Sequence, residues 1–187
     1  MKLNELKKIV IDCDKCELHK ENIKRVFGTG TKSAEIMVIG KHPSKRDYKE
    51  EKPFTGKYGD ILRGLFKEQD IKLEKVFFTT LLKCATNKSK QEYYNQCVTF
   101  LDKQIETIRP KIIITLGNTT SKYILNKFEL VDNVPGISEI HGKAYPVYTL
   151  NIGKIDIIPF YHPAVSMYPA LLEVLKEDMK KVKERLQ

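Results

Sequence analysis

The alternation of short apolar runs with longer helical patterns constrains the fold of this 187-residue chain more than any other feature. Four runs have the length and composition of buried strands, and a fifth over Tyr145–Leu150 is weaker. The four runs are Glu35–Ile39, Lys75–Leu82, Lys111–Leu116 and Ile155–Phe160. Buried strands that alternate with helices indicate a parallel sheet with helices on both faces. We therefore predict an α/β protein with a single domain over residues 1–187, a three-layer α/β/α sandwich with a central four-stranded, mainly parallel sheet.

Helical periodicity fills the segments between these runs. The predicted helices are Thr55–Glu68, Ser89–Ile108, Asn118–Asn126 and Pro169–Leu186, and another begins within Met1–Ile11. In such a fold, ligands bind beyond the carboxyl ends of the strands. Four segments leave those ends, and we expect them to converge on one site. They are Ile39–Gly59, Thr79–Cys84, Gly117–Thr120 and Tyr161–Tyr168.

The segment Ile39–Gly59 is much longer than an ordinary strand-to-helix connection, which has roughly 2–6 residues. It contains two prolines, a histidine, several lysines and Phe54. Long ordered loops that follow a strand usually carry a function. We therefore interpret this segment as a functional loop.

Net charge and hydropathy limit the classes of partner that the protein can have. The formal net charge of +9 points to a polyanion, nucleic acid first, although a lysine-rich, solvated surface explains it equally well. No apolar run is long enough to span a membrane, and the N-terminus shows no signal-peptide pattern. We expect a cytoplasmic monomer without a membrane partner.

Four cysteines form two pairs, Cys13 with Cys16 and Cys84 with Cys97. In a cytosolic protein such a set favours metal binding over disulfides. The candidates are a structural zinc ion and a [4Fe–4S] cluster, and the wide second spacing favours the cluster. Two alternatives remain: Cys97 is also explained as a core residue of its helix, and Cys13 and Cys16 alone as a redox pair.

Several motifs follow one another in a fixed order. They are Gly40-Lys41-His42-Pro43-Ser44 with Asp47 and Pro53-Phe54-Thr55-Gly56, then Thr80-Leu81-Leu82-Lys83-Cys84, then Arg109-Pro110-Lys111 leading to Leu116-Gly117, and finally His162-Pro163-Ala164. With the order of the cysteines, this set resembles the family 4 uracil-DNA glycosylases, the iron–sulfur branch of the uracil-DNA glycosylase superfamily, over nearly the whole chain. The resemblance implies that the chain flips a base out of DNA and cuts its bond to the sugar.

The resemblance also assigns roles to individual residues. His162 donates a hydrogen bond to the departing base, and Asp47 positions water or stabilises the sugar cation. Phe54 stacks on the flipped base, although without the resemblance it reads as a staple under the next helix. The other residues predicted to bind the base are Lys41, His42, Pro43 and Thr80.

DNA contact is expected from the segment after His162. Met167 and Tyr168, with Ser166, are candidates for a wedge that fills the vacated base stack. The alternative is that they pack under the last helix. Lysines and an arginine near the first loop are expected to neutralise phosphates.

The departures from the family pattern bear on which base is excised. Thr80 stands where the family has an Asn that reads uracil, Lys41 where it has Glu, Ser44 where it has Gly, and Tyr168 where it usually has Arg. We expect a monofunctional glycosylase for uracil or, as Lys41 and Thr80 favour, for a modified pyrimidine, in repair or in defence against modified foreign DNA. The alternative is a catalytically inactive iron–sulfur DNA-binding module.

Overall fold

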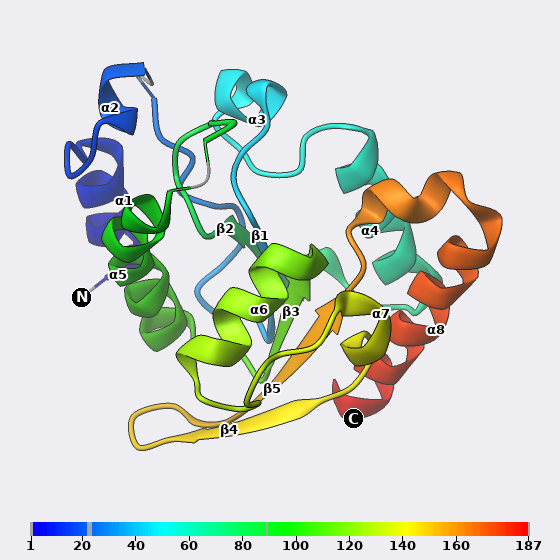
Figure 1. Ribbon diagram of the computed structural model, residues 1–187. Coiled ribbons are helices and arrows are strands. Elements are labelled where there is room, and N and C mark those ends of the chain that lie inside the picture. The colour runs from blue at the N-terminus through cyan, green and yellow to red at the C-terminus, as the bar shows by residue number, and fades with distance from the viewer. Residues whose placement is uncertain (1, 22–23, 89, 187) are drawn as a thin grey trace.

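The computed structural model describes residues 2–21, 24–88 and 90–186. The strands are β1 (Ile36–Gly40), β2 (Val76–Thr80), β3 (Ile112–Leu116), β4 (Tyr145–Thr149) and β5 (Gly153–Phe160). They form one sheet in the order β2-β1-β3-β5-β4 (Figure 1). Neighbouring strands among β2, β1, β3 and β5 are parallel, and β4 runs antiparallel to β5. The α/β class is confirmed, but the prediction of four strands is wrong, because the sheet has five.

The additional strand is β4, which covers most of the weak run Tyr145–Leu150. It lies at the edge of the sheet, where Val147 is buried while Pro146 and Tyr148 are exposed. A half-exposed antiparallel strand alternates apolar and polar positions instead of presenting a continuous apolar run. The weak sequence signal of this strand follows from its position at the edge.

Helices cover both faces of the sheet (Figure 1). They are α1 (Leu3–Ile11), α2 (Leu18–Glu21), α3 (Lys45–Glu50), α4 (Lys57–Glu68), α5 (Gln91–Ile108), α6 (Gly117–Lys127), α7 (Ile137–Ile140) and α8 (Pro169–Leu186), with 3-10 turns η1 (Leu73–Lys75) and η2 (Pro163–Met167). Within the described ranges, no helix is both long enough and apolar enough to traverse a bilayer.

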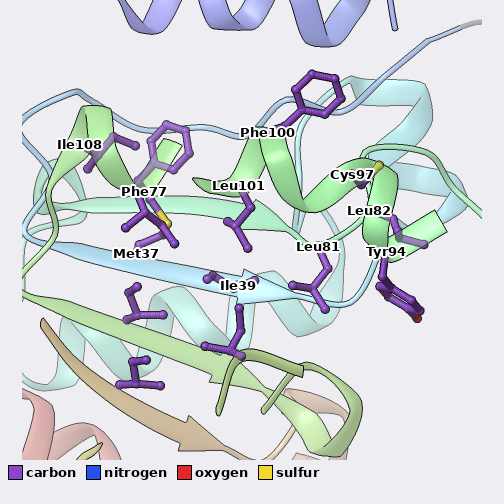
Figure 2. Close-up of a cluster of buried hydrophobic side chains, with 14 of the residues drawn as sticks. Met37, Ile39, Phe77, Leu81, Leu82, Tyr94, Cys97, Phe100, Leu101 and Ile108 are labelled. Atoms are coloured by element: carbon purple, nitrogen blue, oxygen red, sulfur yellow. The ribbon is translucent and has the colours of Figure 1, made fainter. Parts of the chain in front are cut away.

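Side chains on the two faces of the sheet pack into two separate apolar cores. On β1, Met37 and Ile39 pack with residues of α1, α5 and α6 (Figure 2). Ile36 and Val38 point the other way and pack with α4 and α8. Each of the strands β1, β2 and β3 has five residues, and all of them are buried, as expected for parallel strands covered on both sides.

The strand register brings the carboxyl ends of the parallel strands to one edge of the sheet. Gly40 at the end of β1 pairs with Thr80 at the end of β2. Leu116 at the end of β3 pairs with Phe160 at the end of β5. The four segments that were predicted to converge therefore all leave the same edge.

The segment after β1 differs from the predicted loop because it contains helix α3. The backbone N–H of Asp47 donates to Ser44 Oγ over 3.1 Å, and the backbone N–H of Ser44 donates to Asp47 Oδ2 over 2.9 Å. This reciprocal pair is a capping box, which satisfies donors at the start of a helix. The Ser44-x-x-Asp47 spacing is the sequence signal for this helix.

Candidate active site

A cavity of about 260 Å³ lies between the segment after β1, the start of α4 and the segment after β5. Its lining residues are His42, Ser44, Asp47, Phe54, Gly56, Tyr58, Gly59 and His162. Four predicted site residues, His42, Asp47, Phe54 and His162, are thus brought together. A larger hollow of about 760 Å³ lies over Lys103 and Arg109 and includes none of the predicted site residues.

Phe54 forms one wall of this cavity in a backbone conformation with φ of 58°. Two glycines make room for it: a Cβ atom on Gly40 would lie 2.8 Å from Phe54 Cζ, and one on Gly59 only 1.7 Å from the Phe54 carbonyl oxygen. Arg63 Nη2 donates to that oxygen over 2.8 Å, and the Phe78 ring meets the Phe54 ring edge-on at 6.0 Å. The left-handed conformation costs about 1–2 kcal/mol, so these contacts hold the ring against backbone strain.

Asp47 is 7% exposed, and its carboxylate is a structural acceptor. Its Oδ1 atom accepts hydrogen bonds from the Thr55 backbone N–H and hydroxyl, each over 2.8 Å, and its Oδ2 atom accepts from Ser44. Burial favours a higher pKa for Asp47, but the hydrogen bonds from Thr55 and Ser44 outweigh it and hold the pKa below its ordinary value. The carboxylate therefore stays ionised while it ties α3 to Thr55.

His162 presents a hydrogen-bond donor to the cavity. The backbone N–H of Ala164 donates to His162 Nδ1 over 3.1 Å, so the neutral ring carries its proton on Nε2. Desolvation, and then the nearby His42, lower the pKa of His162, which keeps the ring neutral at neutral pH. The Tyr58 ring packs edge-on at 5.6 Å, and a Cβ atom on Gly117 would lie 3.4 Å from His162 Cβ. The contact from α4 thus orients the imidazole, and the absence of a side chain at Gly117 leaves room for His162.

Three predicted base-binding residues lie outside the lining of the cavity: Lys41, Pro43 and Thr80. The Lys41 carbonyl accepts from the backbone N–H of Leu82 over 3.0 Å, which joins the first loop to the segment after β2. Thr80 is 2% exposed, and its hydroxyl donates to the Leu82 carbonyl over 2.6 Å. Pro43 is buried.

Tyr58 is a cavity residue that sequence reasoning missed. It lies in the first turn of α4 and is 43% exposed. Its position between Gly56 and Gly59, directly after the Pro53–Gly56 motif, is the available signal. Its edge-on contact with His162 makes it part of the same site.

The segment after His162 forms η2 and leads into α8. Met167 is 69% exposed and Tyr168 59%, while Ser166 is half-buried. These exposures argue against the alternative that Met167 and Tyr168 pack under the last helix. Exposed basic side chains of the first loop and α4 are Lys45, Arg46, Lys49, Lys52 and Lys57.

The four cysteines lie in one region, away from the cavity. Cys84 and Cys97 are part of the core that contains α1 and α5, and Cys13 and Cys16 pack against it (Figure 2 shows Cys97 beside Leu82). Burial, with a contribution from the neighbouring Cys97, Cys16 and Cys13 and against the Arg25 charge, raises the pKa of Cys84 to about 12. Among the described residues, no group of three or more His, Cys, Asp or Glu side chains is arranged to hold a metal ion as it stands.

Lys83 connects the cysteine region with the end of β2. It is 1% exposed, and its Nζ atom donates to Thr79 Oγ1, the Thr80 carbonyl and Gln104 Oε1 over 2.7, 2.7 and 2.9 Å. Burial raises the pKa of the Cys97 thiol, and the nearby backbone N–H of Lys83 opposes that rise. Burial lowers the pKa of the Lys83 ammonium to about 7.

The fold and the cavity define the class of protein. A family model described as the uracil DNA glycosylase superfamily matches residues 27–187, and the chain belongs to this superfamily. Within it, the chain is a member of the type-4 branch. It is 37% identical to the type-4 uracil-DNA glycosylase of Sulfurisphaera tokodaii, with 97% of this chain and 84% of that protein covered.

Two further type-4 uracil-DNA glycosylases support this assignment. The protein of Saccharolobus solfataricus is 40% identical, with 93% of this chain and 82% of that protein covered. The protein of Archaeoglobus fulgidus is 33% identical, with 97% and 92% covered. The resemblance drawn from the ordered motifs is confirmed.

Proposed function

We propose that this chain is a DNA glycosylase that flips a pyrimidine out of DNA and hydrolyses its N-glycosidic bond, leaving an abasic site. The observation that carries the proposal is the single cavity with an aromatic wall at Phe54 and a neutral donor imidazole at His162. The names of its type-4 relatives support the same reaction.

The flipped base stacks on Phe54. Flipping costs a few kcal/mol, and a base–aromatic stack returns about 1–3 kcal/mol. As the glycosidic bond breaks, its electron pair moves to the base, and the Nε2–H of His162 donates to the resulting anion. Backbone N–H groups of Lys41 and His42 bind a base carbonyl. Removal of one such preorganised donor typically costs about 10²–10³-fold in rate.

The sugar becomes positively charged as the base departs. The ionised Asp47 carboxylate lines the cavity and stabilises this charge through space. Its hydrogen bonds to Thr55 and Ser44 also keep the loop in place. Asp47 therefore acts with its position fixed before the substrate binds.

The base is uracil or a modified pyrimidine, and the environment of Thr80 favours the second. A Thr at this position cannot form the paired donor and acceptor contacts of an Asn amide. Its hydroxyl proton is already donated to the Leu82 carbonyl. Its methyl group would lie 3.5 Å from a Cβ atom on Gly40, next to the Phe54 ring. An apolar contact there tolerates a substituent on the base edge better than an amide does.

We further propose a monofunctional reaction without a Schiff-base lysine. A nucleophilic lysine must reach the sugar carbon. Lys41 lies outside the lining of the cavity, and the Lys83 ammonium is bonded to three internal acceptors. Asp47 is bonded to Ser44 and Thr55 and not to Lys41, so the cavity is not closed by an ion pair between them.

DNA contact comes from η2 and the basic side chains near the cavity. The exposed Met167 and Tyr168 side chains fill the space that the flipped base leaves, with Ser166 between them and His162. The basic side chains of the first loop neutralise phosphates, which makes binding weaken as salt rises.

We propose Cys13, Cys16, Cys84 and Cys97 as the ligands of a [4Fe–4S] cluster. The donor set is four thiols of one region that are near enough to raise one another's pKa. A single zinc ion is the alternative and requires four sulfurs about 2.3 Å from one atom. When bound, the group supplies a structural clamp between the N-terminal segment and α5.

A cleavage screen tests the proposed function. The purified protein is incubated with DNA that carries uracil, hydroxymethylated or glucosylated pyrimidines, and abasic sites are broken with alkali. We expect cleavage by the wild type and a loss of about 10²–10³-fold in His162→Ala. Cleavage at uracil alone would refute the proposed preference for a modified pyrimidine. No cleavage of any substrate with DNA binding intact supports the inactive DNA-binding module instead.

A further inference from the structure

Hydrolysis of the glycosidic bond requires a group that accepts the proton of the attacking water. Two side chains of the cavity have the chemistry for this role, Asp47 and His42. The proposed function leaves this role open, because Asp47 is needed there only for its charge. Geometry separates the two candidates.

Asp47 is poorly suited to accept a proton. Its Oδ1 atom accepts two hydrogen bonds from Thr55 and its Oδ2 atom accepts one from Ser44, so three of about four acceptor positions are occupied. Those bonds hold its pKa below the ordinary value for a carboxyl group. A general base is most effective when its pKa lies near the working pH.

His42 has the opposite arrangement. Its Nδ1 atom lies 3.1 Å from the carbonyl oxygen of Pro43, and because that oxygen can only accept, Nδ1 carries the proton. The neutral ring then has a lone pair on Nε2. No hydrogen bond in the described part of the chain engages Nε2. The contact with Pro43 also orients the ring, as the third group does in other nucleophile-activating sites.

The two imidazoles of the cavity are therefore in complementary tautomers. His162 has its proton on Nε2 because Ala164 donates to Nδ1, whereas His42 has its proton on Nδ1. Both rings line the same cavity. One ring offers a donor and the other an acceptor in the same cavity.

We propose that His42 is the general base of the reaction, with Nε2 accepting the proton of the attacking water. This inference rests on the proposed function. The water oxygen forms a bond to C1′ of the sugar as the bond from C1′ to the base breaks. The electron pair of that bond leaves with the base, which accepts a hydrogen bond from His162. The water proton passes to His42 and then to the released base, so one water is consumed and no redox partner is needed.

Two substitutions separate a base from a structural residue. His42→Ala removes the ring, whereas His42→Asn keeps an N–H group near the position of Nδ1 for Pro43 and removes only Nε2. We expect both variants to lose about 10²–10⁴-fold in single-turnover excision. We expect both to bind a duplex with a reduced abasic site as tightly as the wild type, and added imidazole to accelerate His42→Ala but not the wild type.

Two outcomes overturn the inference. The first is a wild-type rate in His42→Asn, which would mean that the ring only holds the loop. The second is a rate of His42→Ala that imidazole leaves unchanged. Either result is distinct from failure of the proposed function, because that failure is the absence of excision by the wild type on every base in the screen.

Discussion

Gly59→Ala should disable the cavity through the backbone of Phe54. The new Cβ atom would lie 1.7 Å from the Phe54 carbonyl oxygen, and because real Cβ atoms essentially never come closer than 3.0 Å, the two atoms must move apart by about 1.3 Å. That shift breaks the hydrogen bond from Arg63, worth about 1.5–3 kcal/mol, and moves the ring that stacks on the base. Loss of the stack removes about 1–3 kcal/mol of binding.

The expected result is a fall of about 5- to 150-fold in kcat/KM, because 1.4 kcal/mol corresponds to a factor of ten. The assay is excision of the best base from the cleavage screen, together with thermal unfolding. Gly64→Ala on the same helix is the matched control, since a Cβ atom there meets nothing within 4 Å. It should keep full activity and gain about 0.5–1 kcal/mol of stability from the helix preference of alanine. Wild-type excision by Gly59→Ala would refute the reasoning.

Three further predictions concern other parts of the molecule. The pKa of Asp47 is lower in the folded state, so the stability that its carboxylate contributes is present above the unfolded pKa of about 3.9 and is lost as pH falls through the folded pKa. Asp47→Asn should therefore be less stable than the wild type at neutral pH and should lose less stability below about pH 4. Thermal unfolding at several pH values measures both effects. Cys84→Ser should lower the iron and sulfide content per chain and the unfolding temperature together, and an unchanged iron content would exclude Cys84 as a ligand. Met167→Ala should slow excision from duplex more than from single-stranded DNA, since only the duplex has a stack to fill, and equal slowing on both would contradict the wedge role.

The parallel part of the fold could be predicted because its strands are buried on both faces. The runs that became β1, β2, β3 and β5 are continuous apolar sequences, and each lies within two residues of its predicted bounds. The edge strand β4 and the short helix α3 were harder to predict. Many residues of these two elements are exposed. The helix α3 is stabilised by local hydrogen bonds, such as those between Ser44 and Asp47, and neither element shows a continuous apolar pattern.

For the site, motif order identified His162, Phe54, Asp47 and His42, which share the cavity. It did not reveal that Asp47 accepts three hydrogen bonds from Thr55 and Ser44, because hydrogen-bond partners are set by the folded loop. Nor could it separate the tautomers of His42 and His162, since both depend on backbone groups of neighbouring residues. Tyr58 was missed because its only sequence signal is its position directly after the Pro53–Gly56 motif, and the residue itself belongs to no motif.

The position of Lys83 has a consequence for how the protein can change over time. A single short segment joins Thr80, a predicted base-binding residue, to Cys84, which belongs to the cysteine region. The Lys83 ammonium is bonded to Thr79 and Thr80 at the start of that segment. Substitutions near Thr80 and substitutions in the cysteine region therefore affect one another. A substitution that improves acceptance of a new base at Thr80 must preserve the carbonyl that Lys83 uses, and a change at Cys84 must leave the Lys83 ammonium within reach of its three acceptors.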